Sequence, residues 1–270
     1  MKRIISLFIL IFSMTTNSFS QSGSKTYILV HGAWYGGWCW YKVVPLLQAK
    51  GYHVIAVDLP GYGNDTTAAA SVTLNDYVQK VAAAANTVKD KVVLVGHSMG
   101  GAVISQAAEL LGPDKVEKLV FLDAFFLRNG ESIFAQVAQI NEAGKTVTDF
   151  KVEHPASEYL IFSDDKKTAL MNPLMIKEVF CHDCSAADIA LAQEKLRWQP
   201  VACLATPINV TDSRYGAIPK YYIRCTKSRD LDRRSILHNM PCKKIYELPS
   251  SHSVFFSMPE KLVAILAEIY

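Results

Sequence analysis

The sequence has little excess charge of either sign. Its 270 residues include 28 lysines and arginines and 25 aspartates and glutamates, which gives a formal net charge of +3 at pH 7. Nucleic-acid-binding proteins usually carry a basic patch or stripe, and this chain has none. We therefore expect no nucleic acid among its partners.

Long hydrophobic runs are also missing, apart from one near the N-terminus. Residues 4–14 are apolar, follow Lys2 and Arg3, and precede the small residues Ser18 and Ser20. This order predicts a secretory signal peptide over 1–20, cleaved before Gln21, and a periplasmic or secreted protein. The alternative is an uncleaved N-terminal anchor. No later stretch is long enough to span a bilayer, so we expect no membrane contact after cleavage.

Cysteine is sparse and does not form a zinc-binding pattern. The chain has six cysteines, and Cys181-His182-Asp183-Cys184 has no second C-x-x-C pair to complete a metal site. We expect no metal, and either a disulfide or two plain thiols at this loop. Cys225 falls in an apparent core strand and is predicted to be a buried thiol.

Half of the residues are hydrophobic, and the chain has neither internal repeats nor low-complexity tracts. Predicted strands alternate with predicted helices, and such alternation indicates an α/β fold with a mostly parallel sheet covered by helices on both faces. The strands are expected at 26–30, 53–58, 91–95, 116–121, 221–225 and 244–248. Short helical pieces interrupt the alternation between about 128 and 215. We interpret residues 21–270 as a single domain, with a helical cap inserted at 128–215.

The most informative stretch is Gly96-His97-Ser98-Met99-Gly100, between a β-branched run and an apolar helical pattern. A G-x-S-x-G sequence between a strand and a helix is typical of a nucleophile elbow. The turn is so sharp that its serine adopts a strained conformation, and the glycines clear space around it. Free N–H groups at the helix start favour developing negative charge near this serine.

These motifs resemble the α/β-hydrolase family, and more narrowly its plant methylesterase and hydroxynitrile lyase branch with bacterial relatives. The matching segments are His31-Gly32-Ala33, Gly37-Trp38-Cys39-Trp40, the elbow, Leu122-Asp123-Ala124-Phe125, Asp212-Ser213-Arg214-Tyr215-Gly216 and Ser251-His252-Ser253. The resemblance implies the α/β-hydrolase fold, with Ser98 as nucleophile and His252 as general base. It also implies an oxyanion hole formed by the backbone N–H groups of Ala33 and Met99.

The chain departs from this branch at the catalytic acid. The family's acid follows the strand at 221–225, where the register points to Ser228, and a serine cannot stabilise an imidazolium by charge. Two substitutes remain open, and a site without any acid is the third possibility. Asp123 follows the strand after the elbow strand, and Asp230 lies two residues beyond Ser228. We favour Asp123, because it follows an apolar strand and is expected to be partly buried.

These residues predict a cofactor-independent serine hydrolase of small apolar or aromatic carboxylic esters. Trp34 and Phe125 are the expected substrate-binding residues, and a small-molecule ester is the expected partner. The alternatives are a hydroxynitrile lyase-like enzyme or a non-catalytic binding protein of the same fold. The lyase members carry threonine at the position of Gly32 and lysine at the position of Ser253. The sequence leaves the ester and the oligomeric state open.

Overall fold

The computed structural model describes residues 25–144, 154, 156–237 and 240–270. Its centre is a six-stranded parallel sheet with the order β2-β1-β3-β4-β8-β9. The strands are β1 (Thr26–Val30), β2 (His53–Val57), β3 (Val92–His97), β4 (Val116–Leu122), β8 (Lys220–Cys225) and β9 (Lys244–Leu248). Every residue of β1 and β3 is buried, as expected for apolar strands covered on both faces.

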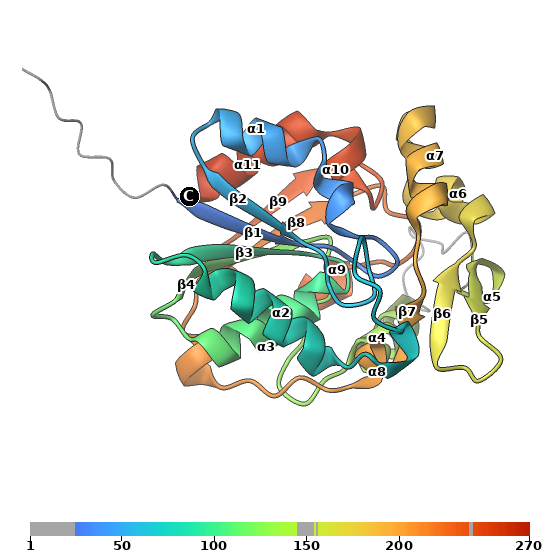
Figure 1. The fold of residues 1–270 in the computed structure, drawn as a ribbon, viewed down its shortest axis with the longest axis horizontal. Helices are drawn as coiled ribbons and strands as arrows, with labels where there is room; N and C mark the ends of the chain where they lie inside the picture. The colour runs from blue at the N-terminus through green and yellow to red at the C-terminus, as the bar shows by residue number, and fades with distance from the viewer. Residues whose placement is uncertain (1–24, 145–153, 155, 238–239) are drawn as a thin grey trace, which may run out of the picture.

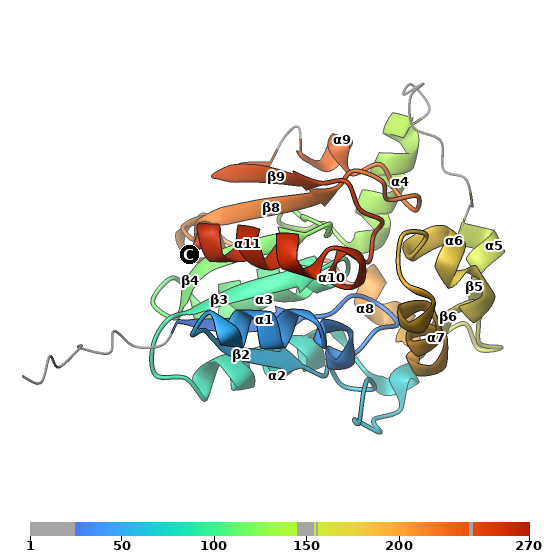
Figure 2. The ribbon, with the colours of Figure 1, turned by 90° about the horizontal axis from the view of Figure 1, so that it is seen from above.

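Helices cover both faces of the sheet and form two hydrophobic cores (Figure 1). On one face lie α2 (Leu74–Asn86) and α3 (Gly100–Leu111). On the other lie α1 (Val43–Ala49) and α11 (Pro259–Ile269), which are in front of the sheet in Figure 2. Thr73 begins α2 with a capping box, in which its side chain and that of Asp76 satisfy backbone N–H groups. The predicted fold class is therefore confirmed.

The helices and strands from α4 to α8, between β4 and β8 in the chain, lie at the carboxyl end of the sheet (Figures 1 and 2). This β4–β8 segment contains helices α4 (Ile133–Gly144), α5 (Ala156–Tyr159), α6 (Ile176–Phe180), α7 (Ala186–Lys195) and α8 (Val201–Ala205). It also contains a three-stranded antiparallel sheet of β5 (Leu160–Phe162), β6 (Thr168–Met171) and β7 (Gln199–Pro200). Our expectation of helical pieces alone was wrong here, because strands of two to four residues are too short to show an alternating pattern.

The remaining elements are short. The 3₁₀ helices are η1 (Gly37–Trp40), η2 (Ala69–Ser71) and η3 (Pro173–Met175), and η4 (Asp212–Gly216) is a π-helical turn. The C-terminal part adds α9 (Arg234–Leu237) and α10 (Val254–Ser257). In the part of the chain that the structure describes, no helix has the length and hydrophobicity needed to cross a bilayer. The predicted signal peptide at 1–20 lies outside the described residues.

Candidate active site

Ser98 occupies a sharp turn between β3 and α3. Its φ angle is +52°, a conformation that residues other than glycine rarely adopt. The glycines make this turn possible, because a Cβ at Gly96 would lie 2.5 Å from the carbonyl oxygen of Gly100. Ser98 is 8% exposed, and its remaining exposure is to a pocket. The backbone therefore has the geometry of a nucleophile elbow, as the sequence predicts.

Ala33 and Met99 line the same pocket as Ser98. Met99 directly precedes the first residue of α3, where backbone N–H groups have no partner within the helix. Ala33 follows Gly32 in the loop after β1. A Cβ at Gly32 would lie 2.9 Å from the Cβ of Ser98, so a larger residue does not fit there without movement. Both predicted oxyanion-hole residues thus lie at the elbow.

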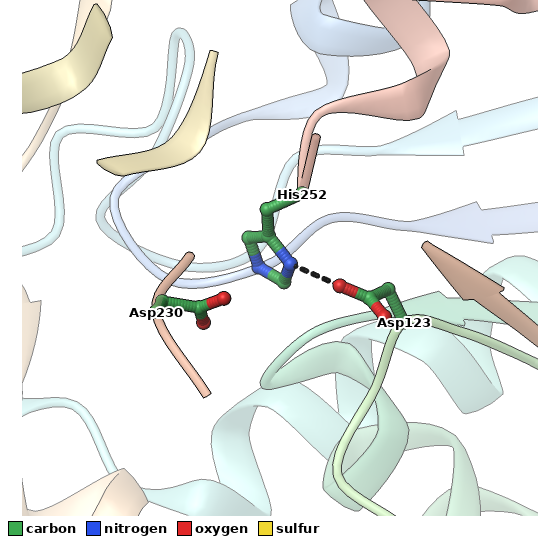
Figure 3. Close-up of side chains that lie close together, drawn as sticks. All are labelled: Asp123, Asp230 and His252. Carbon is green, nitrogen blue, oxygen red and sulfur yellow. Dashed lines mark hydrogen bonds and ion pairs between the residues drawn. The ribbon is translucent and has the colours of Figure 1, made fainter. Parts of the chain in front are cut away.

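His252 lies in the loop after β9 and bonds to Asp123, which follows β4. The distance from His252 Nδ1 to Asp123 Oδ2 is 2.7 Å (Figure 3). Since a carboxylate only accepts, Nδ1 carries a proton, and in the neutral form of such an imidazole the lone pair is on Nε2. A base needs that lone pair in order to take a proton from a hydroxyl. Within the described residues, no hydrogen bond yet joins Ser98 to His252; such contacts often tighten only with substrate.

Asp123 is fully buried and held on several sides. Ser228 Oγ donates to its Oδ2 at 2.6 Å, and the backbone N–H of Cys225 donates to its Oδ1 at 3.1 Å. Burial alone raises the pKa of Asp123, but the nearby Arg233 cation and His252 outweigh it, so the pKa falls below its usual value. Asp123 therefore remains a carboxylate near neutral pH.

Asp230 bonds to Arg233 and not to His252. Both of its oxygens accept from Arg233, at 2.9 Å and 2.7 Å. Burial opposes ionisation, yet Arg233 and His252 lower the pKa of Asp230 to about 2. In Figure 3 Asp230 lies beside the His252 ring without a bond to it. Of the two candidate acids, the structure brings only Asp123 into hydrogen bonding with His252.

One ligand atom from each of Asp123, Asp230 and His252 lies within 4.8 Å of the others, as in a small metal site. The side chain of Arg233 contacts both carboxylates, at 3.2 Å from Asp123 and 2.7 Å from Asp230. Its guanidinium therefore supplies the positive charge that a cation would supply between these carboxylates.

A cavity of about 390 Å³ opens in front of Ser98, between the sheet and the β4–β8 segment. Trp34 and Phe125, the predicted substrate-binding residues, line it. Trp34 donates to the carbonyl of Ala169 at 3.0 Å and stacks on Phe180. Most other lining residues are apolar, among them Ile133, Phe134, Val137, Tyr159, Leu160, Phe162, Leu204 and Leu231. The cavity is suited to an uncharged, apolar group.

A sequence profile described as "Alpha/beta hydrolase family" matches residues 27–265. The chain belongs to the α/β-hydrolase family. Within it, the chain falls in the branch of the plant methylesterases. "Putative methylesterase 11, chloroplastic" from Arabidopsis thaliana is 32% identical over 254 residues, which cover 90% of this chain and 63% of that protein. The chain thus spans less than two thirds of that relative.

Other relatives match along nearly their whole length. "Methylesterase 7" from Arabidopsis thaliana is 31% identical over 263 residues, covering 92% of this chain and 97% of that protein. The crystal structure of the methylesterase MES16 from Arabidopsis superposes with a TM-score of 0.75 at 26% identity. That superposition covers 91% of this chain and 98% of the other.

Two contributors to the site of this α/β hydrolase were missed in the sequence. Phe180 comes from α6 and places its ring centroid 5.0 Å from that of His252. Its carbonyl also accepts from the N–H of Ser253 at 3.0 Å. Arg233 lies in a charged stretch of the sequence, yet its side chain is only 1% exposed. Neither position has a local motif, so only tertiary structure identifies them.

The Cys181–Cys184 pair, left open above, forms a disulfide beside the loop that carries His252. Between the two cysteines, Asp183 accepts from the N–H of Ser251 at 2.9 Å. His97 supports the same loop, because its Nε2 donates to the carbonyl of His252 at 3.1 Å. Cys225 is buried and free, as predicted.

Proposed function

We propose that this protein is a serine hydrolase that cleaves small, uncharged carboxylic esters through an acyl-enzyme intermediate. The observation that carries the proposal is the Asp123–His252 hydrogen bond next to a strained Ser98 at an apolar cavity. The acid that was missing from the family position is supplied from a neighbouring strand. This counts against a binding protein that has lost its catalytic residues.

The reaction divides into two displacements. Ser98 Oγ attacks the ester carbonyl carbon while His252 Nε2 takes the hydroxyl proton. The backbone N–H groups of Ala33 and Met99 stabilise the oxyanion of the tetrahedral intermediate. The carbon–oxygen bond to the alcohol then breaks, and His252 returns the proton to the leaving alkoxide. Water repeats the attack on the acyl-enzyme, again through His252, and the carboxylic acid leaves.

The cavity favours an apolar acyl or alcohol group. Its aromatic walls come from Trp34, Phe125 and Phe180, and its volume of about 390 Å³ lies in the lower part of the range for small-molecule sites. Asp230 contributes a carboxylate to the wall, which repels a negatively charged substrate. The named methylesterase relatives support a methyl ester as the first substrate to test.

Two features count against a hydroxynitrile lyase. A threonine in place of Gly32 would place its Cβ too close to Ser98. At the position where the lyases carry lysine, Ser253 is fully buried and bonded to the Tyr35 hydroxyl at 2.9 Å. No cation is therefore supplied there for a leaving cyanide.

The experiment is Ser98→Ala, tested with a short-chain p-nitrophenyl ester. We expect turnover to fall by at least about 10³-fold, because the covalent route is lost. An organophosphonate should label wild-type protein at Ser98 and leave the variant unlabelled. Wild-type kcat/KM in Ser98→Ala would overturn the proposal.

A further inference from the structure

Arg233 is a buried cation that connects the two carboxylates of the site. Its Nη1 lies 3.2 Å from Asp123 Oδ2, and its Nη2 lies 2.7 Å from Asp230 Oδ2. All three side chains are at most 6% exposed. A buried charge without a partner is strongly disfavoured, so these three groups form one electrostatic unit.

The charges of this unit depend on the protonation of His252. With neutral His252, Asp123, Asp230 and Arg233 carry −1 together, and protonation of the imidazole brings the cluster to zero. Without Arg233 the carboxylates would carry −2 and hold a proton on His252 more strongly. Without Asp230 the cluster would already be neutral, and a proton on His252 would leave a buried positive charge.

We propose that Arg233 and Asp230 are positioning residues that act through Asp123 and set the pH range in which His252 is a free base. Arg233 orients the Asp123 carboxylate and reduces its attraction for the imidazole proton. Asp230 balances Arg233, so that the imidazolium formed during catalysis is still stabilised. The link to catalysis rests on the serine-hydrolase function proposed above.

The other titratable groups around His252 do not supply the charges that Arg233 and Asp230 supply. The neighbouring histidine, His97, is neutral because burial and then repulsion from His252 lower its pKa well below the usual value. Burial raises the pKa of the surrounding thiol and phenol groups, which keeps them uncharged: Cys225, Tyr222, Tyr159 and Tyr35. Asp183 adds a carboxylate, which bonds to the backbone of the same loop. Among the residues that the structure describes, Arg233 is therefore the cationic side chain nearest to Asp123.

The test compares Arg233→Met, Asp230→Asn and the double variant Asp230→Asn/Arg233→Met. The readout is kcat/KM for p-nitrophenyl acetate, a neutral ester, between pH 4 and 9. Arg233→Met should move the midpoint of the acid limb up by at least about 0.5 pH unit, and Asp230→Asn should move it down by a similar amount. The double variant should return to within about 0.3 unit of wild type.

Opposite shifts distinguish this proposal from a structural role, because a loss of packing lowers kcat in every variant and leaves the midpoint unchanged. Shifts in the same direction, or none, would overturn it. If Arg233→Met does not fold, Asp230→Asn and the double variant still decide, and Arg233→Lys should keep the wild-type midpoint.

A second readout needs no turnover. In protein labelled with ¹³C at histidine Cε1, the His252 signal, identified by its loss in His252→Gln, should titrate with the same opposite displacements. If the wild type is inactive but the His252 titration is displaced in the variants as expected, the proposed function is contradicted and the electrostatic role stands. If the wild type is active but the His252 titration is the same in every variant, the electrostatic role is contradicted and the proposed function stands.

Discussion

Asp123 takes a backbone conformation that aspartate seldom adopts. Its φ angle is +44°, and Ser98 (+52°) and Trp34 (+67°) also have positive φ angles. Strain of this kind costs on the order of 1–3 kcal/mol per residue and persists only where surrounding contacts enforce it. Here the contacts come from Ser228, Cys225, Arg233 and His252. The carboxylate is thereby fixed against His252 Nδ1.

We expect Asp123→Asn to lower kcat by at least about 10²-fold, because the amide neither stabilises the imidazolium nor fixes the tautomer. Asp230→Asn is the matched control, and we expect a loss of less than about 10-fold at the optimal pH. Rates are measured with a p-nitrophenyl ester, and folding is checked by circular dichroism. The reverse ranking would assign the acid to Asp230.

At the scale of elements, the turn from Cys181 to Cys184 supports the loop that carries His252. One hydrogen bond connects them, from Ser251 N–H to Asp183, and Ser253 N–H donates to the carbonyl of Phe180, directly before the turn. The disulfide restricts this turn to a few conformations. The loop that carries His252 is thus braced from the β4–β8 segment as well as from the sheet.

Reduction of this disulfide by a dithiol should lower kcat about 2- to 10-fold with little change in KM, because the position of the base changes more than the cavity does. Cys181→Ser/Cys184→Ser should show the same loss and no further response to the dithiol. The control is Cys203→Ser, a buried free cysteine elsewhere in the core. A loss on reduction that persists in the double serine variant would contradict this role.

The sequence predicts those elements whose pattern is local. Strands β1 and β9 have the predicted bounds, 26–30 and 244–248. β1 is a short hydrophobic run, and β9 combines Ile245, Tyr246 and Leu248 directly before Pro249. The hairpin of β5 and β6 was missed, because Asp164 and its charged neighbours separate strands of three and four residues. The choice between Asp123 and Asp230 also needed the structure, because it depends on the parallel pairing of β4 with β8.

For the molecule as a whole, the cavity lies where two parts of the chain meet. Ser98, Ala33 and Met99 come from the sheet loops, and most of the apolar walls come from the β4–β8 segment. Under the proposed function, residues in the sheet loops carry out the reaction, and the β4–β8 segment determines which substrate shapes fit. Substitutions of the cavity-lining side chains of that segment should alter KM more than kcat.

We propose export of the protein, on the basis of residues 1–20 alone. The basic start, the short apolar run and the small residues before Gln21 favour cleavage by a signal peptidase. Mass spectrometry of protein purified from its native source should show a chain that begins at or near Gln21. An intact N-terminus on intracellular protein would contradict this.

The hydrogen bond between Ser228 and Asp123 has an evolutionary consequence. Since Ser228 Oγ lies only 2.6 Å from Asp123 Oδ2, carboxylates at positions 123 and 228 would lie in direct contact. Ser228→Asp should impair wild-type enzyme, because two carboxylates so close cannot both ionise freely. The same substitution should restore activity to Asp123→Asn, measured as kcat with the p-nitrophenyl ester. This is sign epistasis: the acid can move between strands only through an intermediate with two carboxylates or none.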